Sequence, residues 1–222
     1  MRLAELAYEC VKDAIGTSEG ITFDGFVAGD YDSDREFAMQ ISSAFSCINL
    51  AFARLVTGRK IPYRLDECVV SDGKVPFSKG RILNVVDRLG EGYVRLPFRT
   101  TGNANDVVIT DDVAARLAKV FVEYEPSIPH FTIDSIRKAS YDGIGEPETV
   151  EERIDLEALY GIDGQMCEYV KEYCKGAMVE YVSPDSSKWH TQLAERYFSE
   201  LENRGTQFYQ QSVRNKHGRY MP

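Results

Sequence analysis

The sequence predicts an α+β fold, in which a helical bundle of four main helices is interrupted by an antiparallel β domain and followed by an extended C-terminal tail. Apolar residues recur with the period of a helix near both ends of the chain and with the period of a strand between them. The last twenty residues carry four cations and no acid, although the chain has a net charge of -9. We therefore expect a helical pair at 1–57, a β insertion at 58–126, a long linker at 127–159, a closing helical hairpin at 160–202 and a basic tail at 203–222.

Two amphipathic helices are predicted in the first segment. The first begins near Leu3 and ends at Gly16, with apolar residues three and four positions apart. The second follows a capping box of Ser33 and Glu36 and ends at Gly58. Its apolar stripe comprises Phe37, Ile41, Ala44, Phe45, Ile48, Phe52 and Leu55.

Short strands are predicted between residues 61 and 124, where the period is two and turns such as Asp72-Gly73 interrupt the pattern. Val120, Val122 and Tyr124 alternate with residues of an acidic outer face, which is typical of a half-buried strand. Pro97 places the strand before it at a sheet edge, or ends it. Close turns between short strands favour an antiparallel sheet or a small barrel.

Helical periodicity returns after a linker whose fold the sequence does not predict, apart from a weak helical pattern near residues 133–139. Residues 166–181 carry a continuous apolar stripe and predict a helix that faces the core. Ser183-Pro184-Asp185 then predicts the start of a last helix that reaches Leu201. These two helices form an antiparallel hairpin.

Composition is that of a soluble globular protein, with 222 residues, 43% of them hydrophobic and 27% charged. No apolar run approaches the roughly 20 residues of a membrane span, and the first residues do not form a signal peptide, so we expect synthesis in a cytoplasm and no membrane. A pI near 5 argues against a basic groove for nucleic acid. Reduced core thiols are expected at Cys10, Cys47, Cys68, Cys167 and Cys174.

Motifs for catalysis, for metal binding and for phosphate binding are absent from the sequence, so we expect no enzyme, no metal and no cofactor. Cys167, Cys174 and His190 could share a face as metal ligands, but separate positions in the core are favoured. A catalytic site around His130, Asp134 and Asp142 in the linker is a weaker alternative.

The basic tail is the strongest candidate for a binding segment. A charged and aromatic segment with few aliphatic residues does not order itself but can order on a partner, although chain ends also commonly fray. Eighteen extended residues at roughly 3.3 Å each would reach about 60 Å. The residues expected to bind are Arg204, Phe208, Tyr209, Arg214, Lys216, Arg219 and Tyr220. A polar loop with Arg99, Asn103 and Asn105 is a second candidate, with an ordinary hairpin loop as the alternative.

Four stretches carry a pattern of helices and strands that is found in a known family. They are residues 48–55 leading into 61–70, Gly80–Asp87, Val120–Pro126, and Leu156–Leu201 with Tyr169-Val170, Tyr173-Cys174 and Ala194–Leu201. In this order they resemble the head-to-tail connector, or adaptor, proteins of tailed bacteriophages, in the variety with a β domain inserted between the helical pairs. The resemblance covers most of the chain.

The resemblance implies a structural protein of the virion neck, made in the bacterial host, that forms a ring of about twelve copies below the portal protein. DNA would pass through the ring without specific binding, and the acidic body would repel its phosphates. The basic tail would clamp the portal, and the loop at Arg99 would face further neck or tail proteins. Two alternatives stay open: another neck ring, such as a stopper or tail-completion protein, and a nucleic-acid binder that uses the basic tail.

Overall fold

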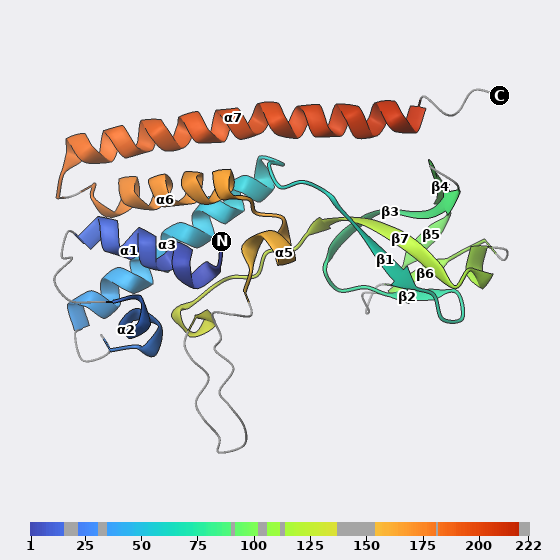
Figure 1. The fold of residues 1–222 in the computed structure, drawn as a ribbon, viewed down its shortest axis with the longest axis horizontal. Coiled ribbons are helices and arrows are strands. Elements are labelled where there is room, and N and C mark those ends of the chain that lie inside the picture. Colours follow the sequence, from blue (N-terminus) through green and yellow to red (C-terminus); the bar gives the residue numbers. More distant parts are fainter. Residues whose placement is uncertain are drawn as a thin grey trace, which may run out of the picture. The chain divides into compact units, whose positions relative to one another are not determined.

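The computed structural model describes residues 1–15, 22–30, 35–89, 92–101, 106–111, 114–136, 154–180 and 182–217. The chain divides into two compact units, and Figure 1 shows their elements. Met1–Lys60 and Pro129–Thr206 form a helical unit, and Ile61–Ile128 belongs to a second unit that holds the described strands. The fold is therefore α+β, and its helical unit is assembled from stretches on both sides of the β region.

Three helices of the helical unit, α1, α3 and α6, pack against one another. Their contacts bury the apolar stripes that the sequence predicts, including Leu6, Ile48 and Val170, each of which is fully buried. The helices are α1 (Leu3–Ile15), α2 (Phe23–Ala28), α3 (Arg35–Thr57), α5 (Leu156–Tyr160), α6 (Gly164–Met178) and α7 (Pro184–His217). The predicted capping box of α3 lies outside the described side chains.

Two short helices were missed by the periodicity argument. In α2, Thr22 accepts a hydrogen bond from the Gly25 amide, and Gly29 ends the helix with a left-handed φ of 84°. In α5, Asp155 accepts hydrogen bonds from the amides of Glu157 and Ala158. Helices of five and six residues are too short to repeat an apolar stripe, so their caps carry the main signal.

Helix α3 is the one described helix whose length and composition would allow it to cross a bilayer, with 21 residues from Phe37 to Thr57 and a mean hydropathy of 1.2. We expected no such segment from the sequence. In this fold α3 packs against α1 and α6 and has a polar outer side, where Ser42, Ser43 and Ser46 each donate a hydrogen bond to the carbonyl four residues earlier. An apolar stripe on one side and a polar outer side are typical of an amphipathic helix of a globular protein.

The end of α3 shows why Gly58 is needed there. The left-handed residue is Arg59, with a φ of 53°, and not the glycine. A Cβ atom on Gly58 would lie 2.7 Å from Cζ of Phe198 in α7. Gly58 therefore provides space for α7, while the main-chain bonds from Gly58 to Arg54 and from Lys60 to Leu55 close the helix.

Two antiparallel sheets form the β unit. One sheet has the strand order β1-β7-β3-β4 and the other has the order β2-β6-β5. The strands are β1 (Arg64–Val69), β2 (Lys74–Pro76), β3 (Gly80–Leu89), β4 (Gly92–Leu96), β5 (Phe98–Thr100), β6 (Asp106–Ile109) and β7 (Lys119–Pro126). Strand β4 is an end strand, as Pro97 predicted. The turn predicted at Asp72-Gly73 is confirmed, because both residues have positive φ and Ser71 and Lys74 exchange main-chain hydrogen bonds.

The core of the β unit contains the predicted stripe of β7, since Val120, Val122 and Tyr124 are at most 1% exposed. They pack with buried residues that come mainly from the second sheet and from β3, namely Val75, Phe77, Val85, Val107, Ile109 and Ala114. The outer residues of β7, such as Glu123 and Glu125, lie on the opposite face.

The C-terminal segment differs from the prediction of an extended tail from residue 203 onward. Helix α7 continues without a break to His217. Gly205 disfavours a helix by only about 1 kcal/mol, and no proline follows before Pro222. Polar composition was therefore a poor reason to end the helix at residue 202.

Candidate functional site

The predicted portal-binding residues lie at the end of α7 and beyond it. The backbone at Arg204, Phe208, Tyr209, Arg214 and Lys216 is helical, and their side chains lie outside the described ones. Arg219 and Tyr220 lie outside the described residues. In the predicted loop, Arg99 is an exposed residue of β5 that pairs with Val108, while Asn103 and Asn105 are also outside the described residues.

The alternative metal ligands are not brought together. Cys167 and Cys174 are buried in α6, and His190 of α7 contacts a carboxylate instead, with 2.6 Å between its Nδ1 and Oε2 of Glu172. No group of three possible metal ligands is found in the part of the chain that the structure describes. The sulfur of Cys174 forms a hydrogen bond with Cys10 of α1, and burial raises the pKa of Cys174.

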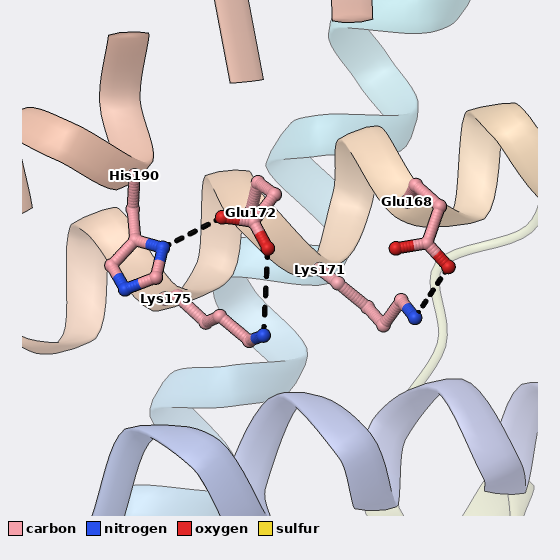
Figure 2. Close-up of polar contacts among 5 residues, drawn as sticks. All are labelled: Glu168, Lys171, Glu172, Lys175 and His190. Atoms are coloured by element: carbon pink, nitrogen blue, oxygen red, sulfur yellow. Dashed lines mark hydrogen bonds and ion pairs between the residues drawn. The ribbon is translucent and has the colours of Figure 1, made fainter. Parts of the chain in front are cut away.

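Helices α6 and α7 meet through polar contacts that periodicity did not reveal (Figure 2). Glu172 is only 7% exposed, and its carboxylate contacts both His190 and Lys175, the latter at 3.4 Å. One turn further on, the hydroxyl of Ser187 donates a 2.8 Å hydrogen bond to the carbonyl of Gly176. These contacts give hydrogen-bond partners to the buried side chains of Glu172 and Ser187, and they join α6 to α7.

Arg54 connects α3 to the same hairpin. Its guanidinium lies over the rings of Tyr173 and Phe198, at 5.4 and 5.3 Å from their centres, and forms a 2.8 Å ion pair with Glu195. This hydrogen bond raises the pKa of Arg54 above its usual value. Lys60 covers the ring of Phe198 from 4.6 Å. The two cations fix α7 on the end of α3 through aromatic faces.

Tyr169 lies at the centre of this region and is fully buried. Its hydroxyl has no hydrogen-bond partner among the described residues. Burial raises the pKa of Tyr169 to about 12. The neutral phenol therefore persists at physiological pH, and its ring packs against Tyr173 and Phe198.

A second polar cluster lies on the inner side of the β unit. Asp66 of β1 accepts a 2.7 Å hydrogen bond from Lys79 and a 3.0 Å bond from the hydroxyl of Tyr124. Burial opposes ionisation of Asp66, but the two hydrogen bonds together with the positive charges of Lys79 and Arg64 outweigh it, and they hold the pKa of the carboxyl below its usual value. Burial, together with the bond to Asp66, raises the pKa of Tyr124 to about 12.

The outer face of the first sheet carries charges that are unevenly distributed. Strands β1 and β7 contribute Glu67, Glu123, Glu125 and a single cation, Lys119, whereas β3 and β4 contribute Arg81, Arg88 and Arg95. Lys119 pairs with Glu67 at 2.5 Å and Arg81 pairs with Glu125 at 2.6 Å. Asn84 donates a hydrogen bond to Glu123. One half of the face is therefore acidic and the other half is basic.

The alternative catalytic residues do not form a described site. His130 is exposed after β7, and Asp134 is exposed in the short 3-10 turn Ile133–Ser135. Asp142 lies outside the described residues.

No family model matches this chain, and no curated protein matches it either.

Proposed function

We propose that this protein is a structural component of a phage neck, a ring-forming head-to-tail connector that docks on the portal through its C-terminal segment. The observation that supports the proposal most directly is the layout of the chain. Residues 1–60 and 129–206 form one helical unit, and the strands of the described residues all lie between them. This is the order of elements on which the resemblance to connectors rests.

The helical C-terminal segment changes how the proposed clamp would work. Residues 203–217 in a helix span only about 22 Å, which is much shorter than the 60 Å reach of an extended chain. The clamp is thus proposed as a rigid helical arm that inserts into a cleft of the portal. A helix repeated around a ring would bind firmly even if each single contact is weak, because each engaged copy raises the effective concentration of the next.

Copurification with the portal protein of the same genome tests the proposal. We expect a complex whose mass, measured by light scattering, corresponds to about one copy of this chain for each portal subunit. A folded chain that does not associate with an intact portal would contradict the adaptor role and leave another neck ring as the better hypothesis.

Two variants locate the contact. A chain that ends after Asn203 should lose portal binding, and so should the full-length chain with Arg214→Glu and Lys216→Glu, in which two cations are reversed. The full-length chain with Lys74→Glu and Arg116→Glu also reverses two exposed cations, here in the β unit, and serves as the matched control. Undiminished binding of the truncated chain would contradict the clamp.

The alternative hypothesis, that the basic C-terminal segment binds nucleic acid, is tested by measuring the DNA affinity of the same full-length and truncated chains. A basic segment that binds phosphates releases counterions, so its affinity for DNA falls steeply with salt. Strong DNA binding by the full-length chain at low salt, lost on truncation after Asn203, would favour that alternative.

A further inference from the structure

Three helices of the helical unit each contribute a cysteine to one cluster of thiols. Helices α1, α3 and α6 pack against one another (Figure 1), and they carry Cys10, Cys47 and Cys174 respectively. Cys10 and Cys174 are fully buried, whereas Cys47 is only partly buried. The cluster therefore combines two enclosed thiols with one that solvent reaches.

The sulfur atoms of these cysteines lie close to one another. The thiols of Cys10 and Cys174 form a hydrogen bond between α1 and α6. Burial raises the pKa of Cys47, and the nearby thiol of Cys10 raises it further. Burial, Cys10 and Cys47 likewise raise the pKa of Cys174. Each thiol is therefore near enough to the other two for their charges to interact.

The other two cysteines do not belong to this cluster. Cys68 is a residue of β1 in the β unit, where its sulfur contacts the carbonyl of Asp66 at 3.7 Å. Cys167 precedes Cys174 on α6 by about two turns, or about 10 Å along the helix. The structure describes all five cysteines, and Cys10 and Cys174 are the pair that it places in direct contact.

We propose that this cluster is a site of reversible oxidation, in which a small disulfide such as oxidised glutathione converts Cys10 and Cys174 into a disulfide bridge between α1 and α6. Cys47 is the thiol at which the oxidant enters, because it is the one of the three that is partly exposed. A disulfide requires two sulfur atoms that can approach to about 2 Å. Two thiols in hydrogen-bond contact need only a limited side-chain movement to reach that distance.

The oxidation proceeds by three thiol–disulfide exchanges. The thiolate of Cys47 attacks the small disulfide, which releases one small thiol and leaves a mixed disulfide at Cys47. The thiolate of Cys10 then attacks the sulfur of Cys47, so that a disulfide joins these two residues and the second small thiol leaves. Finally, the thiolate of Cys174 attacks the sulfur of Cys10, and Cys47 returns to a free thiol. In sum, two protein thiols give up two protons and two electrons, and one small disulfide becomes two small thiols.

The environment of the cluster makes this reaction slow. The attacking species is the thiolate, and the raised pKa values of Cys47 and Cys174 keep these thiols mostly protonated near neutral pH. Oxidation therefore needs long exposure to the oxidant. The bridge is a slow modification of the fold and not a rapid redox sensor.

The bridge joins the two stretches of chain that build the helical unit. Cys10 lies in Met1–Lys60 and Cys174 lies in Pro129–Thr206, on opposite sides of the β region in the sequence. The two cysteines are 164 positions apart. A cross-link over a long loop removes more entropy from the unfolded chain than one over a short loop. The oxidised helical unit should therefore be more stable than the reduced one.

The setting in which the bridge forms rests on the proposed function. A neck protein is made in a reducing cytoplasm, where thiols stay free, and it meets oxidising surroundings when lysis releases the virion. Oxidation after release would then lock a helical unit that had folded and assembled with free thiols.

Peptide mapping of the full-length chain tests the bridge. The folded chain is incubated with oxidised glutathione, alkylated and digested, and cross-linked peptides are identified by mass spectrometry. We expect the loss of two of the five thiols and a cross-link between Cys10 and Cys174. The melting temperature of the helices, followed by circular dichroism, should rise by about 5 °C or more. A reducing agent should restore both the thiols and the original melting temperature.

Single cysteine variants assign the role of each thiol. Cys10→Ala and Cys174→Ala should each prevent this bridge and the rise in melting temperature that it causes. Cys47→Ala should give the same bridge but slow its formation by about tenfold or more, because the oxidant then has to reach a fully buried thiol. The matched control Cys68→Ala removes a partly buried cysteine from the β unit and should change neither the product nor the rate.

Three outcomes for the folded wild-type chain overturn the inference: all five thiols stay free after long oxidation, the cross-link joins other cysteines, or glutathione stays on Cys47 without a bridge. An unchanged rate in Cys47→Ala overturns the entry role of Cys47. Portal binding is measured separately on the reduced and the oxidised chain. A chain that forms the bridge but does not bind the portal keeps this inference and overturns the adaptor role. A chain that binds the portal and forms no bridge does the reverse.

Discussion

Asn49 of α3 pairs with the main chain of Phe131 as a second strand would. Its Nδ2 donates a 2.7 Å hydrogen bond to the Phe131 carbonyl, and its Oδ1 accepts a 2.9 Å bond from the Phe131 amide. The two residues are 82 positions apart, and the bonds hold the chain where it re-enters the helical unit after the β excursion. The ring of Phe131 packs against Phe52 and Tyr160 beside this contact.

Replacement of Asn49 should therefore destabilise the helical unit. Asn49→Ala leaves the amide and carbonyl of a buried residue unsatisfied, so we expect a loss of about 1–3 kcal/mol in the free energy of unfolding, measured with urea. The control Ser43→Ala removes an exposed hydroxyl from the same helix, and it should change the free energy of unfolding by less than about 0.5 kcal/mol. Equal stability of the two variants would show that the pairing contributes nothing.

The α6–α7 joint gives a second prediction, from two glycines of one helix. A Cβ atom on Gly176 would lie 2.9 Å from Oγ1 and 3.3 Å from the amide nitrogen of Thr191, whereas nothing lies within 4 Å of a Cβ on Gly164. Gly176→Ala should push the helices apart and lower stability by about 1–3 kcal/mol. Gly164→Ala should be neutral or stabilising by up to about 1 kcal/mol. The melting temperatures of the two variants distinguish the two causes. A steric contact lowers the melting temperature only for Gly176→Ala, whereas helix propensity alone would raise it for both variants.

The same helix shows how far the sequence could predict the fold. Periodicity correctly predicted that Met166, Tyr169, Val170 and Cys174 face the core. It also placed Ala177 on that stripe, which is exposed, and it did not predict that Glu172 and Gly176 are buried. These two residues lie on a second side, which α7 covers. A single sequence does not reveal which neighbour will cover a polar face, so the contact of Glu172 with His190 could not be foreseen.

Strand order was beyond the sequence for a similar reason. The period of two located most of the strands, but it did not indicate that β7 would lie between β1 and β3. The registers of β1 on β7 and of β3 on β7 are set by pairing between residues far apart in the chain. In the C-terminal segment, charge and aromatic content suggested an extended chain, whereas the absence of proline between Ser186 and Met221 was the better guide to a long helix.

Two buried tyrosines should respond in opposite ways to removal of their hydroxyl groups. The hydroxyl of Tyr124 donates a hydrogen bond to Asp66, and that of Tyr169 has no partner among the described residues. Tyr124→Phe should therefore cost about 2 kcal/mol of stability, because a carboxylate loses a donor. Tyr169→Phe should be neutral or stabilising by about 1 kcal/mol, because it removes an unsatisfied polar atom. Urea denaturation of the two variants at pH 7 measures both changes in the free energy of unfolding. If Tyr169→Phe loses as much stability as Tyr124→Phe, the hydroxyl of Tyr169 must have a partner, and the prediction is wrong.

Asp66 should make the stability of the β unit depend on pH in the acid range. The folded-state pKa of its carboxyl is lowered, so ionised Asp66 stabilises the fold above its unfolded pKa, which is about 3.9. That contribution is lost as pH falls from this value through the folded pKa, because the unfolded chain binds the proton more readily. In urea denaturation, the difference in unfolding free energy between the wild type and Asp66→Asn should be constant above about pH 5 and shrink below about pH 4.

Lys79→Met tests the cause of that dependence. It removes the 2.7 Å hydrogen bond to the carboxylate and keeps the donor hydroxyl of Tyr124. The folded-state pKa of Asp66 should then be less depressed. The stability that the variant loses as pH falls should therefore be smaller, and the loss should be confined to a narrower pH range just below the unfolded pKa. A wild-type minus Asp66→Asn difference that stays constant down to about pH 2 would instead mean that Asp66 has the same proton affinity in the folded and unfolded chains.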